Sequence, residues 1–196
     1  MRGMNRRSFL AQSLAATAAA SLSPAASGSK LAIGLDHFAV RATGWKAADF
    51  INYAASLKLH TIFLSELGVF ENFEDAYLQS LKEQAHRANL QLYVGTGSVC
   101  ESSNTWKPAN GTGADHLALT IKIAKALGSP VARCYLGNQK DRHTDGGIQK
   151  HIEETIKAIK ANQSRAEAEG IKIARRTVTK YRELLKILPT YLRRRK

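Results

Sequence analysis

Cysteine is scarce in this sequence of 196 residues, and Cys100 and Cys134 are its two examples. Two cysteines are too few for a disulfide framework, and no cysteine–histidine spacing indicates a zinc site. Cys134 lies within an apolar segment, which favours a packed small side chain over a disulfide to Cys100. The chain also lacks Gly-x-Gly-x-x-Gly after its first apolar segment, so a dinucleotide site has no support.

Acidic residues are absent from one end of the chain and nearly absent from the other. Residues 1–30 hold four basic residues and no acidic one, and residues 175–196 hold nine basic residues and one acidic residue. Residues 31–174 hold 16 basic and 15 acidic residues, so the formal net charge of +13 belongs mainly to the two ends. A nearly neutral body weakens any interpretation of the fold itself as a surface for polyanions.

Long apolar runs are also missing. The uncharged stretch from Phe9 to Leu22 follows Arg6-Arg7 and precedes small residues, which is the order of an export signal. This stretch is too short, and too rich in Ala and Ser, to span a membrane. Asn-Arg-Arg-Ser-Phe-Leu resembles the twin-arginine signal of bacteria. We therefore predict a signal peptide over residues 1–27 and an exported, periplasmic protein; a basic amphipathic start is the alternative.

Short apolar segments alternate with longer segments of helical periodicity in the body of the chain. The helical spacing of apolar residues predicts helices over 46–57, 73–88, 115–128 and 147–170. The short segments predict strands over 30–35, 61–64, 90–95 and 130–137, with a fifth strand beginning at 171. Strict alternation predicts an α/β fold in which right-handed crossovers join parallel strands. Periodicity alone leaves both an open doubly wound sheet and a (β/α) barrel possible.

Five phrases of the chain resemble successive parts of the sugar phosphate isomerase/epimerase family, which has a xylose isomerase-like TIM barrel. They are LAIGLDHFAVRATGW, LKLHTIFLSELGVFE, LYVGTGSVC, AKALGSPVARCYLG and KHIEETIKAIKANQSRAEAEGIKIA. The resemblance covers residues 31–174 and implies the first four to five strand–helix units of that barrel, a half-barrel. Residues 175–196 form a basic tail that departs from the family pattern. The tail is expected to derive from a frameshift or premature end, with a naturally adapted tail as the alternative.

The resemblance also implies a chemistry, the isomerisation or epimerisation of a sugar beside a divalent metal such as Mn²⁺ or Mg²⁺. In the family the metal ligands come from the fifth to eighth strands, and the first is a glutamate at the end of the fifth strand. Arg176 stands in that place here, and a guanidinium repels a cation. We therefore expect no catalytic residue and no metal ligand in this chain, and an inactive isomerase/epimerase-like protein.

Four residues near predicted strand ends are candidates for contact with a small sugar or sugar phosphate. His37 follows the first strand and Glu66 follows the second, where a hydroxyl of a sugar could be bound. Arg133 lies inside the fourth strand and is expected to point into the barrel, because a buried arginine needs an anionic partner. Tyr135 shares its face. The alternatives without a ligand contact are a histidine in a solvated turn for His37 and a surface carboxylate for Glu66.

Two further groups of residues invite a functional interpretation. Asp141, His143 and Asp145 lie within five residues and would suit a metal, but a polar loop before a helix explains them more simply. Trp45 and Trp106 lie near predicted loops, where an aromatic ring can stack on a sugar, although packing is the commoner role of tryptophan.

A second function class is a non-catalytic module that binds an anionic ligand or polymer through Arg133, Glu66 and the basic tail. Endonucleases for abasic DNA share the barrel, but their histidine and carboxylate set is not apparent, and export speaks against a genomic substrate. We therefore expect no nucleic acid partner and no membrane span after removal of the signal. Self-association through exposed sheet edges is expected to be possible.

Overall fold

The computed structural model describes residues 32–175. The chain divides into two units, Met1–Ala32 and Ile33–Lys196, and the fold described here belongs to the second. The predicted signal peptide over residues 1–27 lies outside the described residues, and so does the predicted basic tail except for its first residue, Arg175.

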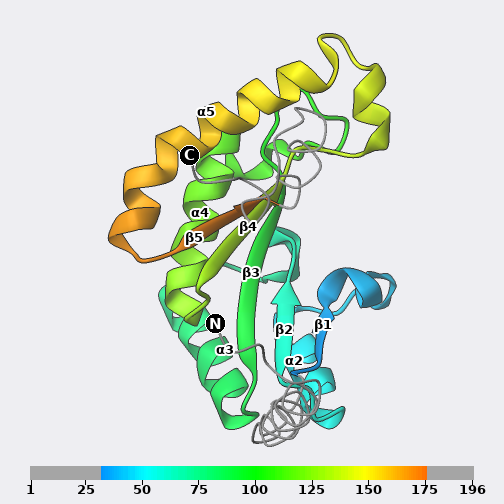
Figure 1. Ribbon diagram of the computed structural model, residues 1–196. Coiled ribbons are helices and arrows are strands. Elements are labelled where there is room, and N and C mark those ends of the chain that lie inside the picture. Colours follow the sequence, from blue (N-terminus) through cyan, green and yellow to red (C-terminus); the bar gives the residue numbers. More distant parts are fainter. Residues whose placement is uncertain (1–31, 176–196) are drawn as a thin grey trace, which may run out of the picture. The chain divides into compact units, whose positions relative to one another are not determined.

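A parallel sheet of five strands forms the centre of the fold (Figure 1). The strands are β1 (Gly34–Asp36), β2 (Thr61–Leu64), β3 (Gln91–Ser98), β4 (Val131–Tyr135) and β5 (Lys172–Arg175). They pair in chain order, and every neighbouring pair is parallel. Pairing in chain order is the arrangement of a (β/α) barrel, whereas a doubly wound sheet reverses its order at a switch point. The predicted partial barrel is therefore confirmed.

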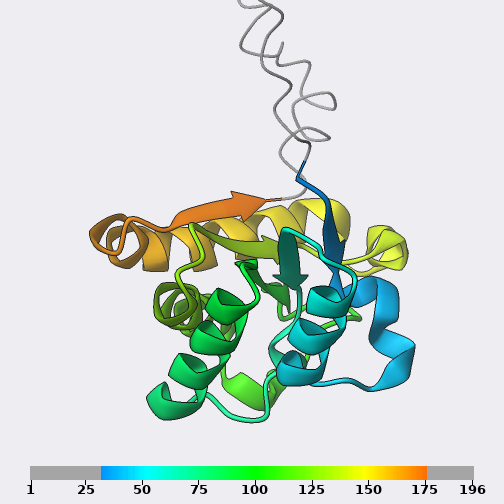
Figure 2. The same ribbon diagram turned by 90° about the horizontal axis from the view of Figure 1, so that it is seen from below.

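Four α-helices connect the strands, and α2, α3 and α4 lie together on one side of the curved sheet (Figure 2). They are α2 (Ala47–Ser56), α3 (Asp75–Arg87), α4 (Gly113–Leu127) and α5 (Gly147–Ala168). Short 3₁₀ turns follow the first four strands: η1 (His37–Thr43), η2 (Leu67–Val69), η3 (Pro108–Asn110) and η4 (Gln139–His143). The helices agree with the predicted ones to within two residues at each end. In the described part of the chain, no helix is long and apolar enough to cross a membrane.

The core lies between the sheet and its helices. Alternate strand residues face it and are at most 2% exposed: Ile62, Leu64, Leu92, Val94, Ala132 and Cys134. The apolar stripe of α4, which includes Leu117, Ile121 and Ala124, is buried in the same cluster. Burial of an aliphatic side chain of this size stabilises the fold by about 1.5 to 3 kcal/mol. Cys100 and Cys134 are both buried thiols, and Cys134 packs in the core as predicted.

The boundaries of α4 show why this segment forms a helix where it does. Thr112 caps the N-terminus by accepting a hydrogen bond from the Asp115 backbone N–H, and the Asp115 carboxylate accepts from the Thr112 backbone N–H at 2.9 Å. The helix ends at Gly128, whose φ of 72° is left-handed and favours glycine. The helix predicted over residues 115–128 therefore ends within one residue of the predicted position.

The first residue of α4 is in close contact with the chain that leaves β3. A Cβ atom on Gly113 would lie 2.0 Å from the backbone oxygen of Val99, which is far inside a normal contact. Only glycine fits here without moving the backbone, so Gly113 fixes the distance between this helix and the sheet.

We expect Gly113→Ala to lower the free energy of unfolding by about 1 to 3 kcal/mol, because the added methyl group overpacks the start of α4. Gly68→Ala is the matched control, since nothing lies within 4 Å of the added atom. The control is expected to change stability by less than about 1 kcal/mol. Urea unfolding measures both, and equal midpoints for the two variants would contradict this account of Gly113.

Candidate functional site

A cavity of about 960 Å³ lies at the carboxyl ends of the first four strands. Its lining comes from the segments that follow β1, β2, β3 and β4, with one residue from β1 itself and two from β4. The lining residues are Asp36, Phe38, Ala39, Glu66, Asn104, Thr105, Trp106, Lys107, Arg133, Tyr135, Gly137 and Asn138. The carboxyl end of a parallel sheet is where enzymes of this architecture hold their ligands.

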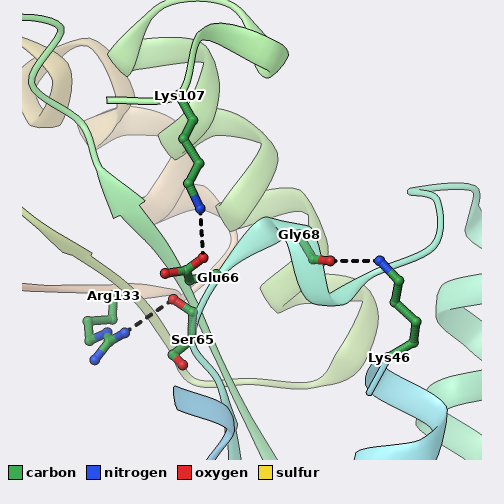
Figure 3. A network of polar contacts seen from close by, with 6 residues as sticks. All are labelled: Lys46, Ser65, Glu66, Gly68, Lys107 and Arg133. Carbon is green, nitrogen blue, oxygen red and sulfur yellow. Dashed lines mark hydrogen bonds and ion pairs between the residues drawn. The ribbon is translucent and has the colours of Figure 1, made fainter. Parts of the chain in front are cut away.

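Arg133 of β4 lies across the inner face of the sheet. Its guanidinium stacks over the ring of Phe63 at 4.3 Å. It also donates a hydrogen bond to the backbone oxygen of Ser65 at 3.2 Å (Figure 3). The carboxylate of Asp36, from β1, lies 3.8 Å from Nη1. The Arg133 side chain is 16% exposed, so this partly desolvated charge is compensated by a carboxylate and a ring face.

Gly95 makes the reach of Arg133 possible. Gly95 of β3 pairs in register with Arg133, and β3 lies between β4 and the ring of Phe63 on β2. A Cβ atom on Gly95 would lie 3.1 Å from Arg133 Nε and 3.2 Å from Phe63 Cζ. A glycine here leaves room for the stacked guanidinium.

Asp36 is held in place by several donors. Its carboxylate accepts hydrogen bonds from the Ser65 hydroxyl and from the Phe38 backbone N–H, the latter at 2.9 Å. These two hydrogen bonds, together with the nearby Arg133 guanidinium, orient the Asp36 carboxylate toward the segment after β1 and toward the end of β2.

Glu66 and Lys107 form a second charge pair over the cavity (Figure 3). Lys107 Nζ lies 3.1 Å from Glu66 Oε2, and the lysine side chain is 75% exposed while the glutamate is 28% exposed. An exposed pair of this kind contributes about 1 kcal/mol or less. Lys46 donates to the backbone oxygen of Gly68 at 3.0 Å and so holds the loop that follows Glu66.

Tyr135 and His116 are the neutral titratable groups of this region. Burial raises the pKa of Tyr135, and the negative charge of Glu66 raises it further, so the hydroxyl keeps its proton at neutral pH. His116 lines a recess of about 130 Å³ that shares Glu66, Lys107 and Tyr135 with the main cavity. Burial lowers the pKa of His116, and its Nε2 has no hydrogen-bond partner among the described residues.

One wall of the cavity is tied together by Asp141. This carboxylate, 1% exposed, accepts hydrogen bonds from the backbone N–H of Asn104 at 2.8 Å and of Asn138 at 2.6 Å, and from the Ser103 hydroxyl. Asn138 also donates from Nδ2 to Asn104 Oδ1 at 2.9 Å. Burial by itself would raise the pKa of Asp141, but the hydrogen bonds from Asn104, Asn138 and Ser103 lower it overall.

Of the four predicted substrate contacts, Glu66, Arg133 and Tyr135 lie together in the cavity. His37 is not among the described lining residues; its ring packs edge-on against Phe50, with centroids 5.7 Å apart. Sequence reasoning did not select Asp36 or Lys107. A signal for Asp36 was its position directly after the first apolar segment, whereas nothing local indicated Lys107.

The two tryptophans have different environments. Trp106 lines the cavity and lies against His116, with ring centroids 4.5 Å apart. Trp45 packs against Tyr53 at 4.8 Å.

Asp141 acts as the acceptor described above, and His143 and Asp145 are exposed.

The cavity does not fit a divalent metal on the residues that the structure describes. Its two carboxylates are those of Asp36 and Glu66, and each is paired with a cation, Arg133 or Lys107. A hard cation needs several oxygen ligands at one point, and a guanidinium beside them opposes it. Arg176, the predicted replacement for a ligand, lies outside residues 32–175.

The fold is similar to that of a solved sugar epimerase, and two further structures match with lower scores. A D-psicose 3-epimerase crystallised with D-fructose matches with a TM-score of 0.53 and 16% identity, over 71% of this chain and 50% of that chain. A D-psicose 3-epimerase from Clostridium cellulolyticum H10, with D-tagatose, matches with a TM-score of 0.43 and 17% identity, again over 71% and 50%. A xylose isomerase domain protein from Planctomyces limnophilus has a TM-score of 0.45 and 13% identity, over 74% and 53%. The first similarity is one of fold, and the chain spans about half the length of these structures.

A different family is indicated toward the carboxyl end. A family model described as "Sigma-54, DNA binding domain" matches residues 136–195. No curated protein matches the chain. In the structure, residues 136–175 include η4, α5 and β5 of the barrel, so the match combines barrel elements with the basic tail. The expectation of no nucleic acid partner therefore stays a prediction.

We expect Asp141→Asn to lower the free energy of unfolding at pH 7 by about 2 kcal/mol, because a charged acceptor of several hydrogen bonds is lost. The folded-state pKa is depressed, so this stabilisation is present above about pH 3.9, the usual pKa of Asp, and is lost as the pH falls through the folded value. The difference from the wild type should therefore shrink in acid. Exposed Asp145→Asn is the control. A constant difference from pH 7 to pH 2, measured by urea unfolding, would argue against this role.

Proposed function

We propose that residues 32–175 bind a small, neutral polyhydroxylated ligand of the sugar class in the cavity at the strand ends. The observation that carries the proposal is the convergence of two charge pairs, a tyrosine hydroxyl and a tryptophan in one cavity. Several fixed polar groups with a few aromatic faces are typical of sites for small polar ligands. The similarity of fold to D-psicose 3-epimerase supports the ligand class.

The charge balance of the cavity favours a neutral sugar over a sugar phosphate. Asp36 and Glu66 offset Arg133 and Lys107, so the lining has no formal excess of positive charge. Arg133 is already engaged by Asp36, Ser65 and Phe63. A phosphate group is normally recognised by uncompensated arginine, lysine or backbone N–H groups.

The same residues give little basis for isomerisation. Proton removal next to a carbonyl needs a carboxylate that is open to the substrate and a cation or donor for the developing oxyanion. Both cavity carboxylates have cationic partners, and a metal does not fit between them. We therefore propose binding without isomerase or epimerase turnover by this half-barrel. We also propose that the protein is exported through the twin-arginine route.

Replacing Tyr135 by Phe removes one hydroxyl from the cavity and keeps the ring. We expect about fivefold weaker binding of D-fructose, corresponding to one hydrogen bond of about 1 kcal/mol, with little change in stability. Tyr53→Phe is the matched control, because Tyr53 packs on Trp45 and lies on α2. Ligand-observed NMR titration measures the dissociation constants.

Two results of this titration would count against the proposal. One is the absence of saturable binding of any hexose by the wild type at millimolar concentration. The other is tighter binding of fructose 6-phosphate than of fructose, because the balanced charges of the cavity predict the opposite order.

DNA binding by the basic tail is a second candidate function. The match to a DNA-binding-domain model over residues 136–195 favours it, as do the nine basic residues of 175–196. Lys and Arg side chains bind duplex DNA by neutralising phosphates and releasing counterions. DNA binding would place the protein with the chromosome inside the cell, whereas export would place it in the periplasm. The location of the protein in the cell therefore distinguishes the two proposals.

Changing Arg193, Arg194 and Arg195 together to Gln tests the tail. If each contacts one phosphate, the slope of log K against log salt should become shallower by about 0.9 per contact. The control changes three exposed basic residues of the helices, Lys82, Arg87 and Lys150, to Gln. Fluorescence anisotropy with labelled duplex DNA measures the slopes. Equal losses in both triple variants, or no binding by the wild type at low salt, would exclude a specific role for the tail.

A further inference from the structure

A second cluster of reactive side chains lies away from the cavity. Cys100 follows β3, and His151 and Glu154 lie one turn apart on α5. The sulfur, a ring nitrogen and a carboxylate oxygen of these residues all lie within 4.8 Å of one another. Cys100 and His151 are fully buried, and Glu154 is half-buried. None of the three lines the cavity.

Hydroxyl groups lie at both ring nitrogens of His151. The Ser102 hydroxyl donates to Glu154 Oε2 at 2.9 Å and lies 2.8 Å from His151 Nδ1. On the other side, the Thr144 hydroxyl donates to the backbone oxygen of Asp141 at 2.8 Å and lies 3.1 Å from Nε2. These contacts hold the ring with Nδ1 beside Ser102 and Glu154 and with Nε2 beside Thr144.

The sulfur of Cys100 lies in the same cluster. It contacts the backbone oxygen of His151 at 3.1 Å and the Thr155 hydroxyl at 2.9 Å. A cysteine sulfur, an imidazole nitrogen and a carboxylate oxygen brought together from α5 and the segment after β3 are the ligand types that zinc takes.

We propose that Cys100 Sγ, His151 Nδ1 and a carboxylate oxygen of Glu154 form a zinc site. Nδ1 is the coordinating nitrogen because Ser102 is a shared neighbour of Nδ1 and Glu154 Oε2. Thr144 then accepts from Nε2–H and fixes the ring, as outer partners of zinc-bound histidines do. Ser102 Oγ, or a water in its place, completes the four ligands.

The distances are compatible with zinc after a small adjustment. Zinc–ligand bonds of about 2.0 to 2.3 Å place the atoms of a tetrahedral site about 3.3 to 3.8 Å apart. Zinc binding would require rotation of the His151 and Glu154 side chains on α5 to bring the present limit of 4.8 Å into this range. The mixture of sulfur, nitrogen and oxygen selects Zn²⁺ over the Mg²⁺ or Mn²⁺ that an all-oxygen site would take.

Zinc binding at this site displaces a proton. The Cys100 thiol loses its proton to solvent, and the sulfur–zinc bond forms without any change of oxidation state. Burial raises the pKa of Cys100, only partly offset by hydrogen bonds with Thr155 and Ser98, so the thiol is protonated before the metal arrives. Affinity therefore falls as the pH is lowered. The bound ion would join α5 to the segment after β3, which are 51 residues apart in the chain at Cys100 and His151.

The test is titration of the full chain, first freed of metal by chelation, with Zn²⁺ and with Co²⁺ as a spectroscopic substitute. We expect one ion per chain, a thiolate-to-cobalt charge-transfer band and the visible bands of tetrahedral cobalt. Cys100→Ser should abolish the charge-transfer band, whereas Cys134→Ala should keep it. Glu154→Gln should weaken zinc binding by at least about tenfold, with the adjacent Glu153→Gln as matched control.

Two outcomes would overturn the proposal. One is the absence of stoichiometric zinc binding by the wild type at micromolar concentration. The other is retention of the charge-transfer band in Cys100→Ser, which would place the metal on Cys134. Should Cys100→Ser fail to fold, the comparison of Glu154→Gln with Glu153→Gln decides the question, because Glu154 is not in the core.

Discussion

The placement of one guanidinium on the inner face of a parallel sheet constrains most of the polar structure around it. Arg133 cannot be turned toward the helices, because the alternate residues of its strand, Ala132 and Cys134, fill that side. It must therefore find its partners across the sheet. The glycine of β3 leaves room, the ring of Phe63 provides a face, and Asp36 supplies the opposite charge from β1. A single charged residue thus connects four strands and contributes to the charge balance of the cavity, on which the proposal of a neutral ligand depends.

The elements of the fold were predictable because each depends on neighbours in the chain. The helical spacing of apolar residues predicted the helices, and the short apolar segments predicted the strands. Gly128 lies at a helix end because glycine readily adopts the left-handed φ required there. The partial barrel followed from strict alternation together with the family resemblance. At the site, Arg133 was predictable from the conflict between its charge and its apolar strand, and Tyr135 from the two-residue period of the same strand.

The remaining features depend on contacts between distant segments, which leave no local pattern. The pair of Lys107 with Glu66 joins two loops 41 residues apart, and Cys100 meets His151 across 51 residues. Residue spacing therefore gave no indication that Cys100 and His151 would be neighbours. His37 illustrates the reverse case: its position after β1 suggested a ligand contact, but η1 turns its ring toward Phe50.

Residues 136–175 belong to the barrel and also to the segment that matches the DNA-binding-domain model. Backbone pairing shows how the structure uses these residues. Residues 172–175 are hydrogen-bonded in register with residues 131–134, so the sheet already uses them, and α5 packs against α4 to reach that strand. Residues in these positions cannot at the same time form an independent DNA-binding fold without the loss of an edge strand and its helix. The change in charge falls at the same boundary: residues 31–174 are nearly neutral, and nine basic residues follow. Any contact with DNA is therefore assigned to the segment after Arg175. The proposed ligand site and the proposed DNA contacts therefore involve different residues, so variants of one are expected to leave the other unchanged.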